Sequence, residues 1–278
     1  MAPRGDSLES QFVTADGVRV HFQEIGTGYP VICLHGAGPG ANSESNFRRN
    51  AGALSQHFRT ILYDMPQFGK SEKVAIEEGR LGFNARVLAA FMAEIGVDKA
   101  HFIGNSMGGQ VALKLAIDHP EKVGRLVILG SGAINKAIFT PLPIEGVKMI
   151  SEYYKGEGPT IEKLRKLLHT IVYDSSFLTD EIIEERFRAS TEPETLDLFT
   201  RRQGPYRKED LGPDLAKINA ETLVVWGLDD RFGALDVGLQ ITRIMPRAQM
   251  HIFSRCGHWA QVEHAEAFNR LVTGFLRD

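Results

Sequence analysis

One serine stands in a pattern typical of a hydrolytic nucleophile. The sequence GNSMGG at 104–109 places Ser106 in the motif G-x-S-x-G, after the short apolar segment 101–103 and before a helical pattern at 111–117. This motif between a strand and a helix predicts a sharp turn that exposes the serine hydroxyl above the sheet. The next backbone N–H, that of Met107, then points into the same space. The alternative interpretation is a glycine-rich turn with an incidental serine.

A nucleophilic serine needs a base, and the base needs an acid that orients it. His258 is the strongest candidate base among the nine histidines, because it lies in a loop between the strand-like segment 250–253 and a helix. Most of the other histidines fall within predicted strands or helices or beside helix ends. The acid should follow the apolar segment 222–226, where both Asp229 and Asp230 stand. Local chemistry does not separate these two aspartates.

A second glycine-rich loop offers hydrogen-bond donors for an oxyanion. The sequence HGAGPG at 35–40 follows the apolar segment 31–34. Acyl transfer needs two donors aimed at the developing negative charge, and we expect them to be the backbone N–H groups of Ala37 and Met107.

Other ligands fit these segments poorly. The spacing of Gly36, Gly38 and Gly40 is G-x-G-x-G, whereas a dinucleotide-binding fingerprint is G-x-G-x-x-G. The GKS sequence at 69–71 resembles the end of a phosphate-binding loop, but Asp64 stands where that loop needs glycine. The pair Cys256-x-His258 has no further ligands at useful spacing, so no metal is expected.

Composition excludes several classes of protein. The chain has 278 residues with 32 basic and 35 acidic side chains, and its net charge of −3 offers no basic face for nucleic acid or an anionic membrane. Two cysteines are too few for a disulfide scaffold. No segment approaches the roughly 20 apolar residues of a membrane span, and no apolar signal segment begins the chain. We therefore expect a cytoplasmic protein.

The order of apolar segments predicts an α/β fold with an insertion. Short buried segments at 31–34, 60–63, 101–103, 126–129 and 222–226 alternate with helical patterns, as in a mostly parallel, doubly wound sheet. From 134 to 203 only helical patterns occur. We interpret 1–133 and 204–278 as the core and 134–203 as a helical lid over the carboxyl edge of the sheet, where ligands bind.

From about Phe12 onward the sequence resembles the α/β-hydrolase superfamily, and within it the meta-cleavage product hydrolases. These enzymes hydrolyse carbon–carbon bonds in bacterial degradation of aromatic compounds. The resemblance rests on the segments 36–41, 104–109, 226–232 and 254–261, together with Asn46. It implies that Asp230 is the acid, that no cofactor is needed and that the protein forms homo-oligomers.

The resemblance also implies the substrate, a 2-hydroxy-6-oxo-hexa-2,4-dienoate cleaved between C5 and C6. Such a substrate carries a carboxylate, and Arg186 both matches the family's carboxylate-binding arginine and lies on the apolar face of the predicted helix 181–188. The alternative is an arginine paired with a buried glutamate. By resemblance, the other substrate-binding residues are Gly36, Gly38, Asn46, Asn105 and Trp259.

The acyl end of the substrate is harder to predict. Gln67 stands where many hydrolases have glycine, and Gly233 and Ala234 replace bulkier residues. Apolar groups could still line a pocket for a flat ring, which predicts preference for a 6-aryl over a 6-methyl dienoate; the candidates are Ile138, Phe139, Leu142, Ile144, Met149 and Phe232. The alternative is that the lid residues among them form only a small core of the lid itself. The alternatives to a C–C hydrolase are a carboxylesterase of the same fold and a non-catalytic small-molecule receptor.

Overall fold

A computed structural model describes residues 8–142, 144–207 and 209–277. Eight strands form one sheet in the order β1-β2-β4-β3-β5-β6-β7-β8, in which β1, β2 and β4 pair antiparallel and the remaining neighbours pair parallel. The strands are β1 (Gln11–Ala15), β2 (Val18–Ile25), β3 (Pro30–Leu34), β4 (Arg59–Tyr63), β5 (Ala100–Asn105), β6 (Val123–Leu129), β7 (Thr222–Gly227) and β8 (Ala248–Phe253).

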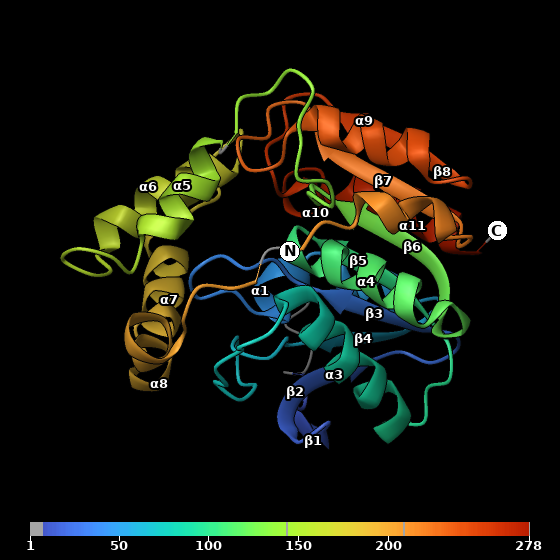
Figure 1. Ribbon diagram of the computed structural model, residues 1–278, viewed down its shortest axis with the longest axis horizontal. Coiled ribbons are helices and arrows are strands. Elements are labelled where there is room, and N and C mark those ends of the chain that lie inside the picture. The colour runs from blue at the N-terminus through green and yellow to red at the C-terminus, as the bar shows by residue number, and fades with distance from the viewer. Residues whose placement is uncertain (1–7, 143, 208, 278) are drawn as a thin grey trace.

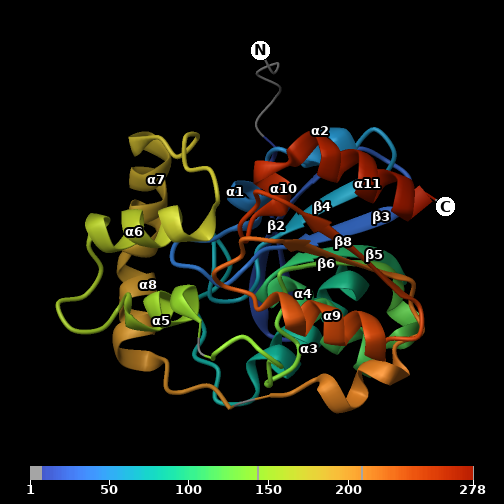
Figure 2. The same cartoon turned by 90° about the horizontal axis from the view of Figure 1, so that it is seen from above.

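Helices cover both faces of this sheet because its central strands are buried on both sides (Figure 2). One face packs against α3 (Arg80–Glu94), α4 (Met107–Asp118) and α9 (Leu235–Ile244). The other packs against α2 (Ala51–Leu54) and α11 (Ala265–Arg277), with the short helices α1 (Ser43–Phe47) and α10 (Ala260–Glu263) beside them. This is the α/β-hydrolase arrangement.

The segment between β6 and β7 is helical and stands to one side of the sheet (Figure 1). It contains α5 (Glu145–Glu152), α6 (Ile161–Ile171), α7 (Asp180–Ser190), α8 (Pro193–Asp197) and a π-helical turn (Leu198–Arg202). These helices have a small apolar core of their own, which includes Leu164, Leu167, Leu168 and Ile183 and continues onto Phe232 and Trp259 of the sheet domain. The segment is thus tied to the loops after β7 and β8.

The chain returns to the sheet through 203–221, which holds the 3-10 turn Gly212–Lys217; a second such turn, Pro120–Lys122, precedes β6. Within the described residues no helix is long and apolar enough to cross a membrane.

Candidate active site

Ser106 lies at the tight turn between β5 and α4. Its backbone has φ 53° and ψ −116°, a conformation that L-residues rarely adopt and that functional sites often contain. The turn is tight because a side chain on Gly104 would collide with the backbone of Gly108 and Gly109. The Ser106 N–H donates to the Leu129 carbonyl at 2.7 Å, which fixes the turn against the end of β6.

His258 and Asp230 are in contact at the neighbouring strand ends. His258 Nδ1 lies 2.8 Å from Asp230 Oδ2, and the two side chains are only 6% and 1% exposed. The other carboxylate oxygen, Oδ1, accepts hydrogen bonds from the N–H groups of Phe232 at 2.7 Å and Gly233 at 2.9 Å. The carboxylate is therefore held on both sides, and it can fix the imidazole with Nδ1 protonated and Nε2 free to accept a proton.

Asp229 has a different environment. Its carboxylate accepts a hydrogen bond from Cys256 N at 3.2 Å, and its own N–H donates to the Cys256 carbonyl at 2.9 Å. Asp229 thereby joins the loop after β7 to the loop after β8, whereas only Asp230 reaches His258. No group of three side chains suited to a metal ion occurs among the described residues.

The end of β6 contacts both the serine turn and the histidine. Leu129 accepts the Ser106 N–H, and the next residue, Gly130, lies so close to His258 that an added Cβ would be 2.7 Å from Nδ1. From the other side, Asn105 Nδ2 donates to the His258 carbonyl at 3.3 Å. Ser106, Asp230 and His258 thus gather at the carboxyl edge of the parallel strands, as the sequence predicts for a ligand site.

The glycine-rich loop after β3 lies against the serine turn. A Cβ built on Gly36 would be 3.3 Å from Ser106 Cβ. His35 holds this loop: its Nδ1 donates to the Gly36 carbonyl at 2.7 Å, and its Nε2 accepts from Met65 N at 3.1 Å. Because burial lowers the pKa of His35, the ring is neutral and suited to these two roles.

The two expected oxyanion donors are placed by these turns. Met107 N–H is the first of α4 and has no acceptor within its own helix. Ala37 follows Gly36 in the loop that contacts Ser106. We refer to residues 35–40 as the oxyanion loop.

Arg186 extends from α7 onto this loop. The side chain is buried, its Nε donates to the Pro39 carbonyl at 2.9 Å, and its guanidinium carbon lies 5.1 Å from the centre of the Trp259 ring. The approach of Arg186 requires glycine at position 40, because a Cβ on Gly40 would overlap the Arg186 backbone carbonyl and its φ of 65° is left-handed. Burial lowers the pKa of Arg186 to about 10, which leaves it charged at neutral pH.

No carboxylate forms an ion pair with Arg186 within the described residues. The adjacent Glu185 instead contacts Arg48, at 3.5 Å. A buried guanidinium without an anion is unfavourable unless a ligand supplies one. This argues against the structural interpretation, an arginine paired with a buried glutamate.

The two asparagines expected to bind substrate are buried. Asn46 on α1 and Asn105 at the end of β5 are 2% and 1% exposed, and the amide oxygen of each has no hydrogen-bond partner among the described residues. Buried polar atoms are nearly always paired. The two amide oxygens therefore have unused capacity to accept hydrogen bonds, whereas Asn105 Nδ2 is already engaged with the His258 carbonyl.

The expected acyl pocket is only partly correct. Phe232 is buried and stacks on His258, with ring centroids 5.3 Å apart and planes inclined by 29°. Gly146 of α5 packs so closely on the Phe232 ring that a Cβ there would overlap it. Met149 joins the lid's apolar core near this ring, while Ile144 is only half-buried.

Three residues expected in that pocket point elsewhere. Ile138, Phe139 and Leu142 are 71%, 69% and 49% exposed, so the prediction that they line a buried pocket is wrong. The reason is a buried carboxylate on α9: Asp236 accepts the N–H groups of Ile138 and Phe139 and turns the chain outward there. Pro143, which belongs to the same expected lid segment, lies outside the described residues.

Sequence reasoning missed two residues that shape the site. His35 could have been found, because it opens the glycine-rich loop that was assigned to the oxyanion. Asp236 had no such signal, since its partners lie almost a hundred residues earlier in the chain.

Comparison with known proteins agrees with this geometry. Residues 29–155 match the family model described as alpha/beta hydrolase fold. The chain is 42% identical to a 2-hydroxy-6-oxo-6-phenylhexa-2,4-dienoate hydrolase of Burkholderia cepacia, over 99% of both chains. It is 43% identical to a 2-hydroxy-6-oxononadienedioate/2-hydroxy-6-oxononatrienedioate hydrolase of Burkholderia vietnamiensis, over 98% of this chain and 97% of that one.

The chain belongs to the meta-cleavage product hydrolases. The family resemblance inferred from the sequence is thereby confirmed, and with it the α/β-hydrolase fold and the assignment as a C–C bond hydrolase. A solved meta-cleavage product hydrolase from Pseudomonas fluorescens superimposes with a TM-score of 0.86 at 31% identity, covering 97% of this chain and 98% of that one.

Proposed function

We propose that this meta-cleavage product hydrolase cleaves the C5–C6 bond of a 2-hydroxy-6-oxo-hexa-2,4-dienoate with a 6-aryl group. The observation that carries the proposal is Arg186, a buried cation that lacks a carboxylate partner within the described residues and lies on the oxyanion loop. The carboxylate at C1 would bind there, between Asn46 and Trp259. A neutral ester would leave this cation without an anion, which disfavours the carboxylesterase alternative.

The proposed roles follow from the distances. His258, oriented by Asp230 at 2.8 Å, first assists the shift of the dienol to its keto form, so that C5 can accept electrons when the C5–C6 bond breaks. It then takes the proton of Ser106 as the hydroxyl attacks the C6 carbonyl. The N–H groups of Ala37 and Met107 stabilise the oxyanion. Cleavage releases 2-hydroxypenta-2,4-dienoate, and water hydrolyses the acyl-enzyme to the second acid.

An aryl group suits the acyl side of this site better than a second carboxylate. Phe232 offers an apolar ring face beside His258. The basic residue next to it, Arg231, is paired with Glu145, its Nε lying 2.9 Å from Oε2. That pairing leaves Arg231 little capacity to bind a substrate tail that carries its own carboxylate.

Product analysis tests this function. The enzyme, incubated with 2-hydroxy-6-oxo-6-phenylhexa-2,4-dienoate, should yield equal amounts of benzoate and 2-hydroxypenta-2,4-dienoate, with kcat/KM far above that for p-nitrophenyl acetate. Ester hydrolysis without dienoate cleavage would favour the carboxylesterase, and no turnover of either would favour a receptor. We further propose that the enzyme needs no cofactor, works in the cytoplasm and forms a homo-oligomer. The mass of the native particle measures the number of subunits directly.

A further inference from the structure

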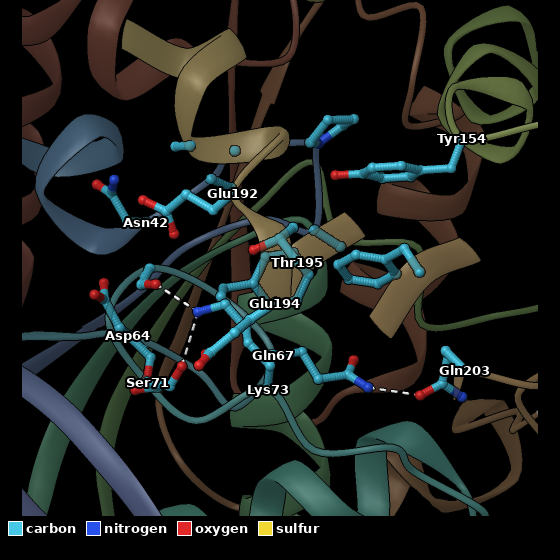
Figure 3. A pocket seen from close by; sticks show the side chains of 18 of the residues that line it. Asn42, Asp64, Gln67, Ser71, Lys73, Tyr154, Glu192, Glu194, Thr195 and Gln203 are labelled. Atoms are coloured by element: carbon cyan, nitrogen blue, oxygen red, sulfur yellow. Dashed lines mark hydrogen bonds between the residues drawn. The ribbon is translucent and has the colours of Figure 1, made fainter. Parts of the chain in front are cut away.

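A cavity of about 1200 Å³ lies between the core and the lid (Figure 3). None of Ser106, Asp230 and His258 lines it, so we call it the second cavity to distinguish it from the active site. Its walls come from the loop after β4, the start of α3, the end of α5 and the segment 189–206. Ala37, Pro39 and Gly40 of the oxyanion loop line it as well. A ligand in this cavity would therefore touch the loop that also contacts Arg186.

One end of the second cavity is aromatic. Tyr154 and Phe199 stack with ring centroids 5.1 Å apart and planes inclined by 19°, and Phe68 lies 6.0 Å from Phe199. Phe199 belongs to the π-helical turn Leu198–Arg202, and such turns are frequent at functional sites. This end presents flat apolar faces to a ligand.

Arg80 places a positive charge at the same end. Its guanidinium carbon lies 4.4 Å from the Tyr206 ring centre and 5.3 Å from that of Phe68. Its Nε is buried without a hydrogen-bond partner among the described residues, where no carboxylate forms an ion pair with it either. Burial lowers the pKa of Arg80, as expected for a cation that lacks a bound anion.

Two of the acidic side chains that line the second cavity lie beside a lysine. Glu192 and Glu194 lie close to Lys73 at the polar end (Figure 3), where the Lys73 ammonium donates to the Gly69 carbonyl at 2.6 Å and the Ser71 carbonyl at 2.8 Å. Among the described residues, none of the acidic side chains that line the cavity forms an ion pair with Arg80; they are Glu44, Asp64, Glu72, Glu192 and Glu194. Arg80 stays available to an anion.

We propose that the second cavity is a binding site for a planar aromatic carboxylate, whose carboxylate pairs with Arg80 and whose ring packs on Phe68 and Phe199. Guanidinium groups bind carboxylates through paired hydrogen bonds, and offset aromatic contacts add about 0.5–1.5 kcal/mol. This is the chemical class of the acid that an aryl dienoate would release. The proposed binding site rests only on the residues of the cavity. It does not depend on which reaction Ser106 performs.

Fluorine NMR with 4-fluorobenzoate tests this site. The probe is added to Arg186→Gln protein, in which the proposed carboxylate subsite of the active site is disabled. Saturable binding should remain, and the additional change Arg80→Gln should weaken it at least about tenfold, equivalent to about 1.4 kcal/mol. The matched control Arg243→Gln, which removes an exposed arginine from α9, should leave the affinity unchanged.

Two further measurements keep the test decisive if Arg80→Gln lowers stability. Tyr206→Leu keeps the charge and removes one ring face, and it should also weaken 4-fluorobenzoate. Neutral 4-fluorobenzamide should bind Arg186→Gln protein at least about tenfold more weakly than the carboxylate. The proposal is overturned if the Arg186→Gln protein shows no saturable binding of 4-fluorobenzoate, if the amide binds equally well, or if a folded Arg80→Gln variant keeps full affinity.

Discussion

Arg186→Gln separates substrate binding from the chemistry at the serine. Arg186 is 7% exposed and has no carboxylate partner among the described residues, so a dienoate would form a desolvated ion pair there. Losing one partner of such a pair costs about 3–5 kcal/mol. At about 1.36 kcal/mol per tenfold, kcat/KM for a dienoate should therefore fall about 10²- to 10⁴-fold. A neutral p-nitrophenyl ester makes no such contact, and its hydrolysis should change less than about fivefold.

The assay follows loss of dienoate absorbance and release of p-nitrophenol in the same enzyme preparations. Arg188→Gln is the matched control, because Arg188 lies on the exposed face of the same helix, and both activities should survive that change. Arg186→Lys keeps the charge but loses the paired donors, so it should fall between wild type and Arg186→Gln. Equal losses on dienoate and ester in Arg186→Gln would show that Arg186 only supports the fold of the oxyanion loop.

Three other predictions test the acid, the acyl pocket and a buried carboxylate. Asp230→Asn should lower kcat about 10³- to 10⁴-fold. Asp229→Asn alters only a loop contact and should lower kcat less than about tenfold. A larger loss in Asp229→Asn than in Asp230→Asn would exclude Asp230 as the orienting acid. The enzyme should prefer a 6-phenyl over a 6-methyl dienoate by about 10- to 100-fold in kcat/KM. Gly146→Val, which displaces the Phe232 ring, should reduce that preference. A preference for the 6-methyl substrate would refute the aryl assignment. Burial tends to raise the pKa of Asp64, but hydrogen bonds from His21 and Ser43 N lower it to about 2. Because that folded-state pKa lies below the ordinary value, Asp64 should contribute about 2 kcal/mol of stability above pH 4 and lose it as the pH falls toward 2. Urea unfolding of wild type and Asp64→Asn should show this difference shrinking with acid, and parallel pH curves would contradict it.

Much of the fold follows from local sequence patterns. The buried central strands have apolar residues on both faces, so segments such as 31–34 and 222–226 are recognisable without any partner. β1 is harder to recognise, because in Gln11–Ala15 only the last residue is fully buried and the others lie on an edge that pairs with β2. An edge strand needs little apolar sequence, and it therefore gives a weak signal.

The candidate site was predictable where one segment carries the chemistry. The motif around Ser106 specifies its own turn, and the helical spacing around Arg186 places that side chain on the buried face. The choice between Asp229 and Asp230 depends on which carboxylate faces a histidine in another loop, and no property of the adjacent residues decides it. The direction of Ile138 likewise depends on Asp236, a partner far away in the sequence.

Ser106 is proposed to perform C–C bond hydrolysis on a dienoate held by this site. A single-turnover experiment with excess Ser106→Ala over 2-hydroxy-6-oxo-6-phenylhexa-2,4-dienoate tests it most directly. We predict that the variant binds the coloured dienoate, seen as a spectral shift, and forms benzoate at least about a thousandfold more slowly than wild type. Benzoate formation at a rate near that of wild type would exclude Ser106 as the nucleophile, because cleavage would then not depend on the serine.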